Sequence, residues 1–311
     1  MRNNLAPVCL FVYNRLIHTK KTIESLKKNT LSSESELFIF SDGPKNEGAI
    51  KAVQEVRDYI KSIEGFKKIT IINAEVNKGL AFSIIEGVKK TINSFGKIIV
   101  LEDDLITSPL FLTFMNKSLD FYENEDKVFT ISGYSNIELP NKFKDEVYFA
   151  HISSTWGWAT WAKEWNSINW ENEYIFKISK DKKLLKQIKR KIGSERIRML
   201  KYQLAGRINS WAVKRLFYQV MENKFTVFPV KTFINNIGHD GSGVHCSANG
   251  NFDVSNELST SSSGVYPNFR EDSEINRIIY TKNNFIFIGK VYSVAVNRLM
   301  FYMKKNGIIK K

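Results

Sequence analysis

Three adjacent carboxylates, Glu102-Asp103-Asp104, follow an apolar run at residues 97–101. A buried run of this kind predicts a strand that ends in the acidic turn. Carboxylates that leave water without a counter-ion are strongly destabilising, so we expect a cation beside them. Mg²⁺ or Mn²⁺, bound by one or two carboxylates and otherwise by phosphate and water, meets that need. Alternatively, Asp104 or Thr107 simply caps a helix that begins near Ser108-Pro109.

Other polar residues follow the remaining strands predicted for the first third of the chain. Short β-branched or aromatic runs alternate there with longer amphipathic segments, which indicates βαβ units and a largely parallel sheet. The expected strands are residues 8–13, 37–41, 69–73 and 98–101, and the expected helices are 19–28, 46–63 and 80–94. Open α/β sheets bind ligands beyond the carboxyl ends of their strands. The polar residues at those ends are Asn14-Arg15, Asp42-Gly43, Asn77-Lys78-Gly79 and the acidic turn.

The rest of the chain has a looser pattern, which we interpret as an acceptor-side half. We expect helices at 108–122 and 211–223, strands at 128–132 and 225–230, and a tryptophan-rich loop at 153–170. We expect this division to give one large domain, 1–250, with a nucleotide-binding half, 1–105, and an acceptor-binding half, 106–250. Residues 251–311 form a C-terminal extension that can associate with a membrane.

The composition indicates a globular protein with a sizeable core. The chain has 311 residues, 43% of them hydrophobic, with two cysteines and a formal net charge of +14. Cys9 and Cys246 are too far apart in sequence for a zinc motif and fit inert thiols in a reducing cytoplasm. No signal or membrane-spanning segment is expected at the start. The basic stretch 180–202 is interpreted as a solvated helix face, and the segment from Asn284 as a helix that suits an anionic bilayer.

Several ordered motifs strengthen the interpretation of the acidic turn. They are PVCLFVYNR, FSDGP, NKGLAFSI, VLEDDLITSP, STWGWATW, NSWAVK and NIGHDGSGVH. With these motifs the chain resembles the GT-A class of glycosyltransferases, over about residues 6–246. The resemblance is to bacterial family-2-like enzymes and the N-acetylglucosaminyltransferase I group. It implies a GT-A fold, a doubly wound Rossmann-like, mostly parallel central sheet flanked by helices, with an acceptor-side C-terminal extension.

The resemblance implies a role for each residue of the nucleotide half. Arg15 and Asp42 would bind the nucleotide, and Lys78 and Gly79 would border the ribose and sugar. Asp42-Gly43-Pro44 and Lys78-Gly79 are also good turn sequences, which is the alternative interpretation.

Within the acidic turn, the same resemblance makes Asp103 the ribose-and-sugar carboxylate and Asp104 the direct metal ligand. Glu102 would lie beside them. The metal would be Mn²⁺ or Mg²⁺, and the donor a UDP-sugar.

Two later segments complete the expected donor site. Trp156 and Trp158 lie in a glycine-bearing loop that would close over the donor, where indole faces can stack on sugar C–H surfaces. A core role is the alternative for tryptophans. Either His239 or His245 would contact the metal or the diphosphate.

An inverting transfer needs a carboxylate that accepts a proton from the acceptor hydroxyl. By resemblance that base should precede Trp211, but Asn209-Ser210 stands there, and an amide is not a base. Either Asp240 serves instead, Asn209 is an inactivating substitution, the transfer is retaining, or the site is inactive.

The predicted function is transfer of a hexose or N-acetylhexosamine to a glycan or lipid-linked acceptor in bacterial surface-polysaccharide synthesis. The predicted location is the cytoplasm, with peripheral contact at the inner membrane face as an option. A nucleotidyltransferase acting on sugar phosphates is the alternative enzyme. A basic protein that binds nucleic acid or membrane without catalysis is the alternative from another class.

Overall fold

The computed structural model describes residues 4–135, 137–140, 143, 145–240, 257–262 and 264–282. The chain forms two compact units. Unit 1 comprises Met1–Trp170 and Asn209–Glu271, and unit 2 comprises Glu171–Ile208 and Asp272–Lys311. The expected domain boundary at residue 250 lies outside the described residues and stays a prediction.

Unit 1 is built on a mixed sheet with strand order β3-β2-β1-β4-β8-β6-β9-β7. The strands are β1 Val8–Val12, β2 Glu36–Ser41, β3 Lys68–Asn73, β4 Lys97–Glu102, β6 Val128–Ser132, β7 Val147–Ala150, β8 Trp158–Trp161 and β9 Phe225–Pro229. The first four strands in that order are parallel neighbours, as are β6 and β9. Strand β8 is antiparallel to both β4 and β6, and β7 is antiparallel to β9. A separate two-stranded sheet pairs β5 Leu105–Thr107 with β10 Ile234–Asn236.

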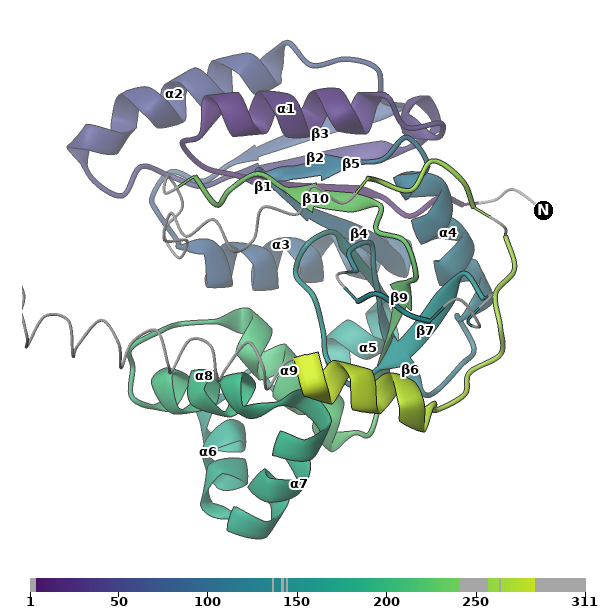
Figure 1. Cartoon of the computed structure of the whole chain (residues 1–311). Coiled ribbons are helices and arrows are strands. Elements are labelled where there is room, and N and C mark those ends of the chain that lie inside the picture. The colour runs from purple at the N-terminus through teal and green to yellow at the C-terminus, as the bar shows by residue number, and fades with distance from the viewer. Residues whose placement is uncertain are drawn as a thin grey trace, which may run out of the picture. The chain divides into compact units, whose positions relative to one another are not determined.

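Helices cover both faces of this sheet (Figure 1). Helices α1 Leu16–Lys27, α2 Glu47–Lys61 and α4 Phe111–Phe121 supply buried residues to the hydrophobic cluster on one face. Helices α3 Leu80–Phe95, α5 Ala162–Ser167 and α9 Trp211–Met221 supply residues to the cluster on the other face. A short 3₁₀ helix, Ser32–Glu34, precedes β2. The expected α/β class, with a mostly parallel central sheet flanked by helices, is confirmed.

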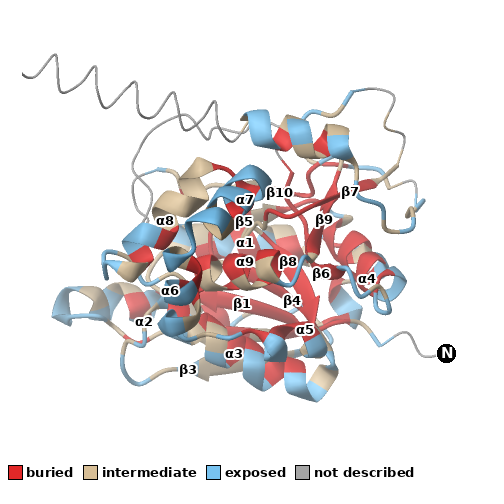
Figure 2. Ribbon diagram, turned by 90° about the horizontal axis from the view of Figure 1, so that it is seen from below, coloured by how far each residue is buried: buried red, intermediate tan, exposed pale blue. Residues whose placement is uncertain are grey.

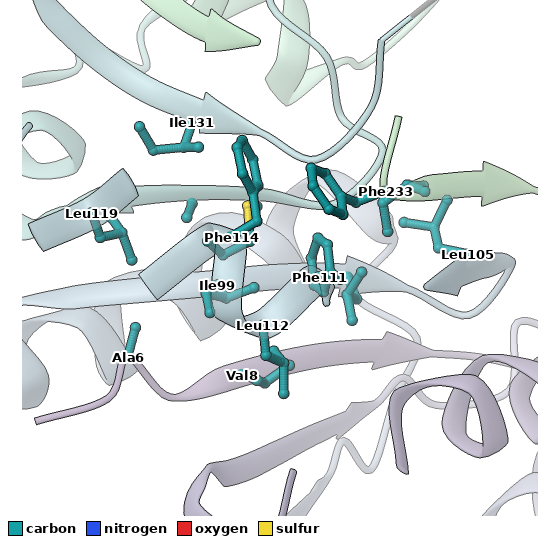
Figure 3. Packing of buried hydrophobic residues seen from close by; sticks show 14 of the residues in the cluster. Ala6, Val8, Ile99, Leu105, Phe111, Leu112, Phe114, Leu119, Ile131 and Phe233 are labelled. Atoms are coloured by element: carbon teal, nitrogen blue, oxygen red, sulfur yellow. The ribbon is translucent and has the colours of Figure 1, made fainter. Parts of the chain in front are cut away.

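The alternation along β1 shows why this strand lies at the centre. Val8, Leu10 and Val12 pack into the first cluster, which Figure 3 shows around α4, whereas Cys9 and Phe11 pack into the second. A strand buried on both faces is typical of a parallel sheet covered by helices. Burial raises the pKa of the Cys9 thiol to about 12, so this thiol is inert at neutral pH, as expected. Cys246 lies outside the described residues.

The tryptophan-rich stretch differs from its expectation as a loop. It contains β8 and α5, so it enters the sheet between β4 and β6. Strand β8 has only four residues, all buried, and a run this short has no readable periodicity. The sequence therefore does not predict this antiparallel strand, which separates the parallel strands β3-β2-β1-β4 from the rest of the sheet.

Unit 2 is helical in its described part, with α6 Asn172–Lys180, α7 Lys182–Ile192, α8 Ser194–Leu204 and helical residues 273–282. The stretch expected to be one basic helix is two helices, because Gly193, with φ of 87°, separates α7 from α8. The segment from Asn284 lies outside the described residues. None of the helices within the described ranges combines the length and hydropathy needed to cross a bilayer.

Candidate functional site

The acidic turn lies at the carboxyl edge of the parallel strands, as predicted. Strand β4 ends at Glu102, and the side chains of Asp103 and Asp104 are almost fully buried. Thr22 of α1 fixes the turn, because its hydroxyl donates to the Asp103 carbonyl at 2.8 Å and accepts from the Leu105 amide at 3.1 Å. The first helix therefore holds the backbone that presents both aspartates.

Arg15 joins the two aspartates. It immediately precedes α1, and its Nη2 donates to Asp103 Oδ1 and, at 2.9 Å, to Asp104 Oδ2. Burial lowers the pKa of the guanidinium, but the ion pairs with Asp103 and then Asp104 outweigh burial, so the net direction is upward. Arg15 stays charged and serves as a counter-ion that the sequence could not assign.

One guanidinium does not balance three carboxylates. Burial, and then the charges of Asp104 and Asp103, raise the pKa of Glu102 to about 8, although Arg15 acts in the other direction. Burial also raises the pKa of Asp103, again partly offset by Arg15. Arg15 alone therefore does not keep the acidic turn fully ionised, and a further cation would favour the ionised carboxylates.

Asp42 organises the loop that precedes α3. Its two carboxylate oxygens accept hydrogen bonds from the backbone amides of Lys78 at 2.8 Å and Gly79 at 2.9 Å. They also accept from the Asn77 side chain at 3.1 Å and the Gly43 amide at 2.9 Å. Asp42 thus brings the predicted Lys78-Gly79 turn to the strand edge, and its contact with a base remains a prediction.

The late loop lies directly on the acidic turn. Strand β10 pairs with β5, and the Ile237 amide then donates to the Asp104 carbonyl at 2.9 Å. A Cβ at Gly238 would lie 2.1 Å from Asp104 Oδ2, so only glycine fits against this carboxylate. The predicted late segment and the predicted metal ligand are therefore neighbours.

The two described residues that follow Gly238, His239 and Asp240, contact different parts of unit 1. The His239 ring lies 5.4 Å from that of Trp156, which lies 4.4 Å from Tyr134, measured between centroids. Asp240 Oδ2 lies 3.2 Å from Nε2 of His18 on α1. The sequence analysis missed Tyr134 and His18, which have no motif of their own. His245 lies outside the described residues.

Trp158 lies elsewhere. It is 1% exposed and stacks on Trp165 and Trp211, each with a centroid distance of 5.3 Å, beneath α3. The Arg215 guanidinium lies 4.4 Å from its ring and donates to the Ser154 carbonyl at 2.8 Å. Burial lowers the pKa of Arg215 to about 9. In this conformation Trp158 is part of the core, and Arg215 links its ring to the backbone at Ser154. Its buried ring has no exposed face for a sugar.

Within the Asn209-Ser210 pair, the serine has a structural role at the start of α9. The Ser210 hydroxyl accepts from the Val213 amide at 3.4 Å and caps α9, while Asn209 is exposed. This cap explains the serine without catalysis. A catalytic role for either residue stays a prediction.

The donor chemistry of the acidic turn suits a hard divalent cation. Asp103 and Asp104 offer carboxylate oxygens, the ligands that Mg²⁺ and Mn²⁺ prefer. Among the residues that the structure describes, no cluster of three or more His, Cys, Asp or Glu forms a ready cage. The turn therefore fits an ion held by one or two carboxylates whose other ligands are phosphate and water, and Arg15 would have to share those carboxylates with it.

No protein-family model matches this sequence, and no curated protein is significantly similar to it. Similar solved structures include a mannosyltransferase, PcManGT from Pyrobaculum calidifontis, in complex with GDP-Man and Mn²⁺. It is 11% identical, with a TM-score of 0.33 over 52% of this chain and 46% of that chain. Residues 1–349 of S. aureus TarS are 10% identical, with a TM-score of 0.40 over 73% and 59% of the two chains. A second S. aureus TarS structure is 14% identical, with a TM-score of 0.31 over 48% and 26%.

This chain thus spans less than two thirds of the length of each of these structures. With TM-scores below one half, these likenesses assign no activity to it. Fold and site together define an α/β protein with a buried, partly neutralised acidic turn at the carboxyl ends of its parallel strands.

Proposed function

We propose that this chain is a glycosyltransferase that uses a nucleotide-diphosphate sugar, a UDP-sugar. The acceptor is a hydroxyl of a glycan or lipid-linked saccharide in bacterial surface-polysaccharide synthesis, and the enzyme works in the cytoplasm. One observation carries the proposal: Gly238 of the late loop packs on the Asp104 carboxylate, which also accepts a hydrogen bond from Arg15. This contact supports the proposal, because the residues predicted as metal ligand and nucleotide ligand lie next to the late loop.

This arrangement suits a diphosphate. A divalent ion at Asp104 would stabilise the charge on the departing nucleoside diphosphate. Arg15 supplies a fixed guanidinium, which matches phosphate oxygens geometrically, and helix α1 begins directly after it. The amino-terminal end of a helix favours negative charge.

The nucleotide and the sugar would occupy opposite sides of this diphosphate position. The loop that Asp42 closes, with Lys78 and Gly79, would border the nucleotide. Trp156 and its neighbours Tyr134 and His239 would border the sugar, because aromatic faces pack against sugar C–H groups. This orientation follows the roles that the family resemblance implies for the two loops.

Asp240 is the proposed base. Its side chain is half exposed, so an acceptor can reach it, and it follows the residues that pack on Asp104. His18, with Nε2 at 3.2 Å, orients its carboxylate. Asp240 would take the proton from the acceptor hydroxyl as the hydroxyl attacks the anomeric carbon, which gives inversion.

Product analysis tests the proposal. The chain would be incubated with individual nucleotide sugars, Mn²⁺ and a lipid-linked saccharide acceptor. Release of nucleoside diphosphate together with acceptor glycosylation is the expected result. Release of pyrophosphate from a nucleoside triphosphate and a sugar phosphate would instead identify a nucleotidyltransferase. Asp104→Asn is the negative control.

A further inference from the structure

The net positive charge of the chain comes from unit 2. Unit 1 contains 26 Lys and Arg residues and 26 Asp and Glu residues, so its formal net charge is zero. Unit 2 contains 20 Lys and Arg residues and 6 Asp and Glu residues. The whole net charge of +14 therefore lies in the 78 residues of unit 2, whereas the residues of the proposed donor site belong to unit 1. Attraction of a nucleotide sugar does not explain a charge that is placed there.

Within unit 2, the described cations are concentrated on α7 and the end of α6. We define the basic surface as the exposed residues Lys180, Lys182, Lys183, Lys186, Lys189, Arg190 and Lys191. Figure 2 shows α7 largely in the colour of exposed residues. Asp181, the only acidic residue among 174–194, accepts from the Leu184 amide at 2.9 Å as the cap of α7. The stretch of sequence that carries the basic surface therefore has a large excess of positive charge.

The apolar stripe of α7 is already used within the unit. Ile188 and Ile192 are buried, whereas the cations between and beside them are exposed. The helix therefore cannot insert an apolar face into another molecule without leaving its own packing. Its available interaction is electrostatic, with a partner that presents many negative charges on a surface.

The aromatic residues of the unit favour a lipid surface over nucleic acid. Phe176 and Tyr202 are exposed, but Lys180 Nζ lies 4.6 Å from the Phe176 ring, and the guanidinium of Arg207 lies 5.6 Å from the Tyr202 ring. Stacking on bases requires open ring faces, and a cation lies over one face of each of these rings. Exposed aromatics beside lysine and arginine are typical of proteins at a membrane interface.

The remaining sequence of the unit has the same character. After Glu274 no acidic residue occurs up to Lys311, while eight Lys and Arg residues alternate with aromatic and aliphatic ones. This composition adds to the attraction for an anionic interface.

We propose that the basic surface of unit 2 attaches this protein to a bilayer that contains anionic phospholipid. Attachment is peripheral and electrostatic, and α7 is its principal described element. The proposal deepens the proposed function by placing the enzyme where a lipid-linked acceptor resides, yet it depends on no step of sugar transfer.

Vesicle co-sedimentation tests the attachment. The full chain would be mixed with phosphatidylcholine vesicles, with or without phosphatidylglycerol, at about 0.05 M and about 0.5 M NaCl. Binding is expected only with phosphatidylglycerol and only at low salt. Equal binding to neutral vesicles, or no binding at low salt, would overturn the proposal. Tighter binding to duplex DNA than to vesicles in the same buffer would also overturn it.

A matched pair of variants locates the surface. One replaces Lys182, Lys183, Lys186, Lys189 and Arg190 with glutamine, which retains good helix propensity. The other makes the same change at five exposed lysines of unit 1, Lys51, Lys67, Lys68, Lys89 and Lys90. Since each basic residue near an anionic surface adds attraction, the first variant should lose at least about tenfold in vesicle affinity. The second should change by less than about twofold. Similar losses in both would contradict a localised surface.

A truncation after Lys282 completes the test. If the truncated chain still binds anionic vesicles in a salt-sensitive way, the result supports the role of α7. If the truncated chain loses all binding while the α7 variant binds like the wild type, the proposed role of α7 is wrong. Circular dichroism and thermal unfolding confirm that each variant is folded. Release of nucleoside diphosphate from a soluble acceptor, measured separately, reports on the proposed function alone.

Discussion

Arg15 donates through Nη2 to Oδ2 of Asp104 at 2.9 Å, and this ion pair ties the start of α1 to the turn that follows β4. The same nitrogen contacts Asp103, so one cation serves two buried carboxylates. Arg15 is therefore the internal counterpart of the cation that the acidic turn predicts. A bound metal and Arg15 would neutralise the same charges.

Replacing Arg15 with glutamine should lower stability by about 1–3 kcal/mol at neutral pH, because two poorly solvated carboxylates lose their counter-ion. Thermal unfolding without and with Mn²⁺ measures the effect. We expect Mn²⁺ to raise the melting temperature of Arg15→Gln by more than that of the wild type. Equal shifts in the two proteins would contradict competition between Arg15 and the metal.

Gly238→Ala should weaken nucleotide-sugar binding about tenfold or more, since the new methyl group has to displace the Asp104 carboxylate. Calorimetric titration with the donor measures the change. Gly48→Ala is the matched control, because its Cβ would lie 3.5 Å from the nearest atom, an ordinary contact. If both alanine variants bind like the wild type, the late loop does not shape the donor site.

Glu102→Gln should stabilise the metal-free protein increasingly as the pH rises. Burial raises the pKa of this carboxyl from its ordinary value of 4.5 to about 8 in the folded state. The folded state therefore holds a proton that the unfolded state releases, and this group makes stability fall between these two values. Melting temperatures in EDTA at about pH 5 and about pH 8 test the sign. An advantage of the variant that is constant with pH would refute the raised pKa.

Asp240→Asn should reduce the turnover number about a hundredfold or more, with little change in donor affinity, because a general base acts on the chemical step. Asn209→Asp is the companion variant, and a carboxylate restored there should raise the transfer rate. An unchanged or lower rate in Asn209→Asp would argue against a base before α9. Full activity in Asp240→Asn would remove Asp240 from that role.

Several strands of the central sheet could be predicted from sequence, for physical reasons. Strand β1 is buried on both faces, and the residues of β4 between Lys97 and Glu102 are apolar. The sequence therefore predicts where these strands end and which polar residues follow them. The strand predicted at 128–132 corresponds to β6. The placement of Glu102-Asp103-Asp104 at the sheet edge followed from those runs.

What the sequence could not show is contact between distant residues. Arg15 and Asp103 are 88 positions apart, and nothing local in either motif pairs them. His18 and Asp240 are still farther apart in sequence, and β10, which precedes Asp240, pairs with β5 close to them. Trp158 and Trp156 are two residues apart and share the same motif, yet only the fold decides that Trp158 is core while Trp156 lies beside His239.

The most direct test of the donor site is thermal unfolding with a panel of nucleotide sugars, without and with Mn²⁺, on the wild type and Asp104→Asn. A ligand that binds the folded state stabilises it in proportion to the logarithm of its concentration over Kd. We predict that at least one UDP-sugar raises the melting temperature of the wild type, more strongly with Mn²⁺, and that Asp104→Asn loses the metal-dependent part. Stabilisation that is the same with and without Mn²⁺ in both proteins, or no stabilisation by any nucleotide sugar, would contradict the account.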